Sequence, residues 1–301
     1  MIALYVSCAK KETQTQNLTE KEQAIKDYKE LYVGSTVTDT ELAWSGNLAN
    51  CNEGTISQIA LDKTLKRVNY FRKICGLPNN MVWNTAHMLP SQKSALIMSA
   101  NNSLSHFPTS SWKCYSTEGA DASSNGNIAL GTHSSESITA WIEDAGGSNY
   151  RTGHRRWILF SRAQDFGFGS TSNASTLYCI SNTDAALASN VPTYITYPPK
   201  YIAQELAFDR WSMGVANPIS FYSGVDFSNA TVTMTSSSGE NLAVTIVSKT
   251  DNGYGDQTIV WEPTGVIKDA TGDVSYHVVI DNFTVNGVAK KHEYDVTIFK
   301  P

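Results

Sequence analysis

The chain has 301 residues, a length that suggests two domains rather than one. Hydrophobic residues make up 41% of it and charged residues 17%, so there is ample material for a core beneath a lightly charged surface. The net charge of −5, without a basic run interleaved with aromatics, argues against a nucleic-acid partner. No apolar run reaches the roughly twenty residues that span a membrane.

The chain begins with a short apolar stretch that ends at Ser7-Cys8, and polar residues follow. This pattern resembles the end of a bacterial lipoprotein signal. The stretch is too short for a complete signal peptide, and Tyr5 stands where leucine is usual. Lipidation of Cys8, which would anchor the chain to a membrane, and a disordered tail both stay open. We expect residues 1–50 to be a tether and lead-in segment, with a short, mostly solvated helix over 18–32.

The chain has five cysteines, an odd count. If Cys8 carries a lipid, an even set suited to an oxidising compartment remains: Cys51, Cys75, Cys114 and Cys179. Four cysteines allow three connectivities, and the sequence does not choose among them, although we favour a bond between Cys51 and Cys114. The spacing Cys-x-x-Cys, typical of zinc sites, does not occur.

Three further helices are predicted, over residues 55–75, about 91–101 and about 135–145. The first carries Leu61, Leu65 and Val68 at helical spacing, and Gly76 suits its C-terminal end. Pro90 suits the start of the second helix. Ser134 or Ser135 can cap the third. The Gly-, Ser- and Asn-rich stretch 119–131 is predicted to be a loop.

After residue 169 the pattern becomes that of β structure. Residues 191–200 include three prolines and are predicted to be the interdomain linker. Five short alternating segments follow, over residues 230–235, 242–248, 257–262, 276–285 and 292–299. Asn286-Gly287 is a strong hairpin signal between the last two. We therefore predict a smaller, all-β, immunoglobulin-like sandwich over residues 191–301.

Two histidines and several carboxylates could form a site in the preceding region. His106 follows a predicted helix, His154 lies in the segment Gly-His-Arg-Arg-Trp, and Glu118, Glu143 and Asp144 lie between them in the chain. Imidazoles and carboxylates that converge in one cleft would supply metal ligands or an acid/base pair. The structural alternative is that His106 caps the second predicted helix, and that His154 bonds to backbone and fixes the turn at Gly153.

Four segments in order resemble domains of the CAP superfamily from bacteria, whose wider members are the cysteine-rich secretory proteins, antigen 5 and the plant pathogenesis-related proteins of group one. They are residues 67–78, 98–106, 127–131 and 140–159, which include Arg67-Val68-Asn69-Tyr70-Phe71-Arg72 and Gly153-His154-Arg155-Arg156-Trp157. The resemblance implies an α/β/α sandwich over residues 51–190. With the β-sandwich that follows, the predicted fold class is α+β.

The same resemblance implies a cleft with two histidines and two acidic residues, in which some family members bind zinc or calcium. Asp144 is the acidic residue of the third helix, because it lies three positions after Trp141. Gly126 stands where the family has glutamate, so Glu118 is the candidate substitute and the affinity for metal is in question. The predicted metal ligands are therefore His106, Glu118, Glu143, Asp144 and His154.

Three functions follow from these residues. The first, which we favour, is an extracellular or cell-surface binding module for a lipid, glycan or protein ligand. The second is a metal-dependent hydrolase in which Glu118 or Glu143 acts as general base toward a metal-bound water. The third is a structural envelope protein tethered through Cys8. The motif Gly-x-Ser-x-Gly of serine hydrolases does not occur.

Overall fold

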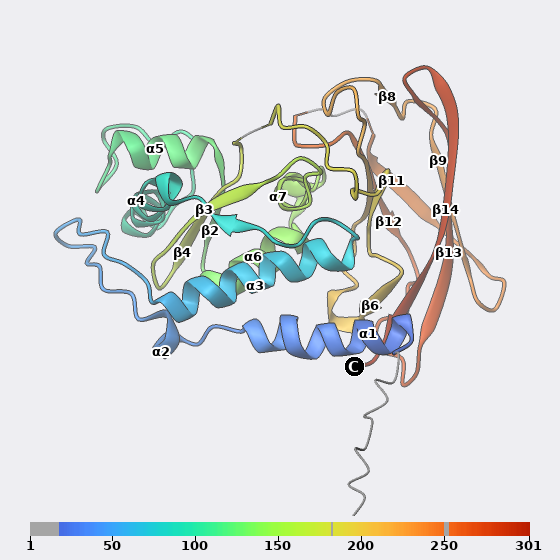
Figure 1. Cartoon of the computed structure of the whole chain (residues 1–301), viewed down its shortest axis with the longest axis horizontal. Coiled ribbons are helices and arrows are strands. Elements are labelled where there is room, and N and C mark those ends of the chain that lie inside the picture. The colour runs from blue at the N-terminus through green and yellow to red at the C-terminus, as the bar shows by residue number, and fades with distance from the viewer. Residues whose placement is uncertain (1–17, 182, 250–252) are drawn as a thin grey trace, which may run out of the picture.

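The computed structural model describes residues 18–181, 183–249 and 253–301, and these form two regions side by side (Figure 1). The first region has a four-stranded sheet of order β1-β3-β4-β2, with α4 and α5 on one side and α3 and α6 on the other (Figure 1). Its main elements are α3 (Gln58–Ile74), β1 (Val82–Trp83), α4 (Thr85–Asn101), α5 (Thr117–Ser124), β2 (Gly126–Leu130), α6 (Ser134–Glu143), α7 (Gly153–Ile158), β3 (Asp165–Ser170) and β4 (Ala174–Tyr178).

The second region contains two sheets, one of order β10-β9-β13-β14-β6 with β8 paired to β13, and one of order β11-β12-β7-β5. Its strands are β5 (Tyr194–Tyr197), β6 (Tyr201–Ala203), β7 (Trp211–Val215), β8 (Val225–Asp226), β9 (Thr231–Ser236), β10 (Asn241–Leu242), β11 (Val244–Ser248), β12 (Thr258–Pro263), β13 (Val274–Val285) and β14 (Val288–Phe299). Asn286 and Gly287 have φ of 51° and 77° between β13 and β14, as a two-residue hairpin requires. The mixed α+β class and the hairpin are confirmed.

The predicted helices form, with different starts. Ser57 caps α3, whose observed span lies inside the predicted one. The second helix, α4, begins at Thr85, so the prediction that Pro90 starts it is wrong. Asn84 caps an additional turn through a bond from Ala86 N, and the proline removes only one backbone bond from a long helix.

The third predicted helix, α6, begins at Ser134, but neither predicted serine caps it. His133 is the N-cap residue and makes no side-chain capping bond. Ser135 Oγ instead accepts a bond from Val37 N (3.2 Å), while Ser134 N donates to the hydroxyls of Ser170 and Ser175. These serines therefore join α6 to neighbouring elements instead of closing its end.

The predicted loop over residues 119–131 is wrong, because this stretch contains most of α5 and all of β2. Ser116 caps α5 by accepting a bond from Gly119 N (3.1 Å), which starts a helix in a stretch of low helix propensity. Gly126 begins β2 where the chain passes close to other backbone: a Cβ there would lie 2.7 Å from Ala122 O. Glycine is therefore required by this close approach and does not mark a loop.

The lead-in segment and the predicted linker also pack more closely than expected. The N-terminal helix α1 (Glu20–Asp27) runs into a π-helical turn (Tyr28–Tyr32) and is followed by α2 (Asp39–Leu42). Tyr28 is only 6% exposed and donates a 2.5 Å hydrogen bond to Glu205, so this helix is not mostly solvated. The predicted linker contains β5, in which Tyr197 is fully buried. Both segments cover the junction between the two regions.

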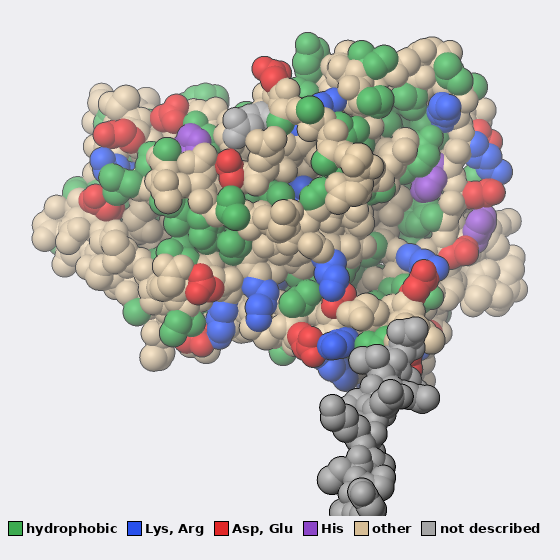
Figure 2. Space-filling model, in the orientation of Figure 1, with side chains coloured by type: hydrophobic (Ala, Val, Ile, Leu, Met, Phe, Trp, Pro, Cys, Tyr) green, Lys and Arg blue, Asp and Glu red, His purple; other side chains and the backbone are tan. Residues whose placement is uncertain are grey.

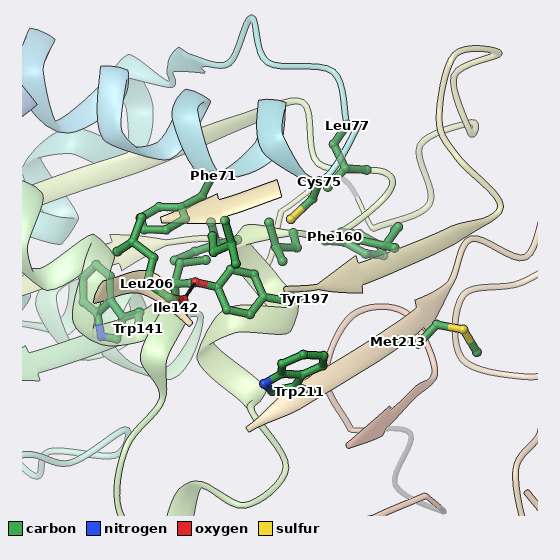
Figure 3. Packing of buried hydrophobic residues seen from close by; sticks show 14 of the residues in the cluster. Phe71, Cys75, Leu77, Trp141, Ile142, Phe160, Tyr197, Leu206, Trp211 and Met213 are labelled. Carbon is green, nitrogen blue, oxygen red and sulfur yellow. Dashed lines mark hydrogen bonds between the residues drawn. The ribbon is translucent and has the colours of Figure 1, made fainter. Parts of the chain in front are cut away.

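A continuous core joins the two regions (Figure 3). Phe71, Trp141 and Phe160 of the first region belong to the same buried cluster as Tyr197 and Trp211 of the second. Since this apolar surface is shared, we expect the two regions to unfold together. Outside the core, Figure 2 shows a face on which uncharged side chains predominate, as the composition predicts.

The cysteines behave in two ways. Cys51 and Cys114 form a disulfide, which confirms the favoured pair. Cys75 and Cys179 are free and buried, and burial raises the pKa of each thiol to about 12. Such thiols stay protonated and unreactive. Cys8 lies outside the described residues. Among the residues that are described, no helix is both long and apolar enough to cross a membrane.

Candidate functional site

A cavity of about 320 Å³ opens at the end of the first region and is lined by both predicted histidines. His106 follows α4, and His154 lies in the first turn of α7. The other lining residues come from four short segments and from the approach to β12: Phe107, Ser124, Gly126, Asn127, Ser148, Asn149, Arg151, Gly153, Trp157, Ile180, Gly253 and Tyr254. The prediction that the two imidazoles share a groove agrees with this arrangement.

His154 is held by a buried carboxylate. Its Nδ1 lies 2.7 Å from Asp144 Oδ1, and its backbone N–H donates to Asp144 Oδ2 at 2.9 Å. The side chain of Asp144 is fully buried, whereas that of His154 is 23% exposed. Asp144 takes the left-handed conformation (φ 57°) as the C-cap of α6, which aims its carboxylate at the start of α7. One residue thus ends a helix and orients the imidazole.

The His106 ring is held by a backbone carbonyl group. Its Nδ1 lies 2.7 Å from the carbonyl oxygen of Ser123, the penultimate residue of α5. A carbonyl can only accept, so Nδ1 of His106 is the protonated nitrogen. His106 does not cap α4, whose C-cap is Asn102. The structural alternative considered for His106 is therefore not what the structure shows.

The two imidazoles are fixed in the same tautomer. Asp144 accepts from Nδ1 of His154 just as Ser123 O accepts from Nδ1 of His106. In each neutral ring the lone pair is therefore on Nε2. A carboxylate or carbonyl behind Nδ1 is the arrangement that orients an imidazole for a ligand at Nε2. The cavity thus offers two hydrogen-bond acceptors, or two nitrogen donors to an ion.

None of the three predicted carboxylates lines this cavity. Glu118 lies in the first turn of α5 with its side chain 58% exposed, and its carboxylate is 3.5 Å from Lys93 Nζ. A backbone N–H and the Lys93 ammonium lower its pKa. Glu143 is exposed and lines a separate surface hollow with Glu205 and Asp209. Only Asp144 among the predicted carboxylates is joined to a cavity histidine.

These positions bear directly on the predicted metal ligands. Within the ranges that the structure describes, no three side chains of His, Cys, Asp or Glu come together as a metal site. A structural or catalytic zinc takes three or four protein ligands. Because Asp144 is already bonded to His154 and Gly126 carries no side chain, the cavity presents two imidazole nitrogens. This donor set does not fit a resident zinc or calcium ion.

The sequence interpretation missed several residues that line the cavity. Phe107 follows His106 directly and is 79% exposed, which the motif His-Phe-Pro could have suggested. Trp157 is only 7% exposed and belongs to the buried core, yet it also lines the cavity. Nothing in the sequence pointed to Tyr254, because it lies about 100 residues beyond His154 and reaches the cavity only through the tertiary fold.

The second region supplies Tyr254 through a segment clamped onto the first region. Asp256 accepts bonds from Ser161 N (2.8 Å) and Ser161 Oγ (2.7 Å), and its carbonyl accepts from Arg156 Nη2 (3.0 Å). Burial raises the pKa of the Asp256 carboxyl to about 6, although its bonds with Ser161 act in the opposite direction. The segment before β12 is therefore fixed against α7 and the residues that follow it.

Comparison with known families identifies a domain within the first region. Residues 65–183 match the model of the CAP family, described as the cysteine-rich secretory protein family. The matched residues span α4 to β4 and most of α3, together with both histidines. The chain therefore contains a CAP domain. A comparison with curated proteins finds no match.

Proposed function

We propose that the protein is an exported binding module whose CAP cleft takes a ligand between His106 and His154. The observation that carries the proposal is the pair of imidazoles fixed by Ser123 O and Asp144, each with Nε2 left for a ligand. Both rings line one cavity together with exposed aromatic surface. A concave pocket with a few oriented polar groups is typical of a ligand site.

Export is proposed from the disulfide. Cys51 and Cys114 are separated by 63 positions, and such bonds persist in oxidising compartments. Anchoring through a lipid on Cys8 remains a proposal. So does an immunoglobulin-like arrangement of the two β sheets, which would make the second region a spacing or adhesion module by fold-level analogy.

Divalent metal enters the proposal only as a weak ligand. Two imidazoles could bind zinc whose remaining ligands are water or groups of a bound molecule. The residues predicted as general bases for the hydrolase alternative, Glu118 and Glu143, do not line the cavity. No observation of the described residues therefore favours hydrolysis over binding. We expect zinc and calcium to leave the melting temperature almost unchanged at equimolar concentration.

The test compares the wild type with His106→Ala and with the double variant His106→Ala/His154→Ala on glycan, lipid and peptide arrays. His277→Ala is the matched control, because His277 is exposed and pairs with Asp295 away from the cavity. We expect at least one ligand class to bind the wild type and the control, and to lose at least tenfold in signal with either cavity variant. His106 is exposed, so its variant keeps the test valid if the double variant unfolds. Binding that is indifferent to His106→Ala, or no binding at all, overturns the proposal.

A further inference from the structure

The chemistry of the cavity wall points to one class of ligand. Among the lining residues that the structure describes there is no carboxylate, and Arg151 is the charged side chain. Hydroxyl and amide groups of Ser124, Ser148 and Asn149 contribute neutral polar surface. A wall of this kind suits a ligand that is neutral and rich in hydrogen-bonding groups.

Aromatic rings provide the apolar part of the wall. Phe107, Trp157 and Tyr254 all line the cavity, and Phe107 is 79% exposed. By contrast, Ile180 is the branched aliphatic side chain among the described lining residues, which offers little surface to an acyl chain. Sugar rings combine C–H faces that pack on aromatic rings with hydroxyls that donate to acceptors such as imidazole Nε2.

Tyr254 is placed so that the second region completes this wall. A Cβ added at Gly153 would lie 2.8 Å from the Tyr254 ring, so the ring packs directly on the turn that carries His154. Arg156 lies over the ring with Cζ 5.5 Å from its centroid. Two residues further on, Asp256 is bonded to Ser161 of the first region. The ring is thus held beside the histidine from two sides.

We propose that the cleft binds a neutral saccharide and that Tyr254, from the second region, is its specificity-determining aromatic residue. The inference rests on the proposed binding function and adds to it the ligand class and the part played by the second region. A cavity of about 320 Å³ lies at the small end of ligand pockets, roughly 300–1,000 Å³, so it suits the terminal residues of a chain.

The experiment titrates the full chain with three neutral trisaccharides: maltotriose, cellotriose and tri-N-acetylchitotriose. Binding is followed by calorimetry and by tryptophan fluorescence, since Trp157 lines the cavity. We expect at least one to bind, Tyr254→Ala to weaken its affinity at least tenfold, and Tyr254→Phe to stay within threefold. Tyr222→Ala is the matched control, because Tyr222 is 58% exposed in the second region and does not line the cavity.

Each remaining outcome overturns the inference. If no trisaccharide binds while a lipid or a peptide binds in a His106-dependent way, the saccharide class is wrong and the proposed function stands. If a trisaccharide binds equally well to Tyr254→Ala, the role of the second region is wrong. Failure of all three ligand classes removes the binding function itself. Thermal melts of each variant confirm that the comparison is made between folded proteins.

Discussion

The two regions of the molecule are held together internally by different interactions. The first region (the CAP region) contains, beside its apolar core, buried hydroxyls that bond to one another: Ser94 Oγ lies 2.8 Å from both Ser123 Oγ and Thr176 Oγ1, and all three residues are buried. In the second region (the β region) the centre is apolar, with Trp211 and Trp261 fully buried. Hydrogen bonds are directional and hydrophobic contacts are not. The CAP region therefore combines apolar burial with a directional hydroxyl network, whereas apolar burial dominates the centre of the β region.

The hydroxyl network leads directly to the cleft. Ser123 uses its hydroxyl to bond Gly119 O and Ser94, while its carbonyl accepts from His106. His154 is likewise fixed by a buried polar group, Asp144. By contrast, the β region contributes Tyr254 at the edge of the cavity and extends the shared core. We infer that substitutions in the apolar core mainly lower the free energy of unfolding. Substitutions in the hydroxyl network should disturb the cleft even where the free energy of unfolding changes little.

The largest effect is expected from Trp211→Ala, in the core shared by the regions. Loss of a fully buried tryptophan leaves a cavity and lowers the free energy of unfolding by about 3–5 kcal/mol. Because Trp211 shares a cluster with Phe71, urea denaturation should show a single transition whether followed by near-UV or far-UV circular dichroism. Two separated transitions would refute a common core. Val288→Ala, at a 56% exposed site, is the control and should change the free energy by less than about 0.5 kcal/mol.

A second test removes the buried carboxylate behind His154. Asp144→Ala leaves the N–H groups of His154 without their acceptor and places alanine at φ 57°, so we expect a loss of about 3 kcal/mol in chemical denaturation. Asp144→Asn keeps one oxygen acceptor and tolerates the left-handed conformation, so it should lose less. Equal losses for the two variants would show that the carboxylate has no particular role in fixing the imidazole.

The sequence revealed the elements of both regions more readily than the way in which they meet. Helical spacing in residues 55–75 and the Asn286-Gly287 turn are local signals, and both predicted structures formed. The start of α5 depends on one capping serine, and β5 lies among prolines, so local propensity misjudged both. His106 and His154 were found because a family resemblance placed them. Tyr254 could not be found, because its contact with Gly153 is a property of tertiary packing.

A third test concerns Asp256, whose bonds with Ser161 join the two regions. The pKa of Asp256, about 6 in the folded protein, lies above its unfolded value of 3.8. The folded state therefore holds the proton more tightly, and this contribution to stability is fully present below about pH 3.8 and is lost as the pH rises through 6. Asp256→Asn cannot titrate, so its free energy of unfolding relative to wild type should rise by about 3 kcal/mol from pH 3.8 to pH 7. Urea denaturation across this range measures the difference, and a pH-independent difference would contradict the assignment.

The smallest change in stability, and the sharpest test of the comparison, is Ser94→Ala. Removing this hydroxyl takes one partner each from Ser123 and Thr176, with an expected loss of about 1–2 kcal/mol. Because Ser123 O holds Nδ1 of His106, we also expect the chemical shifts of the His106 ring to change in two-dimensional NMR spectra. Ser236→Ala is the control, since this hydroxyl bonds to Ser238 and Glu240 in an exposed turn of the β region. If the His106 signals change equally in the two variants, the hydroxyl network does not determine the position of the His106 ring. In that case the hydroxyl network does not distinguish the CAP region from the β region in function.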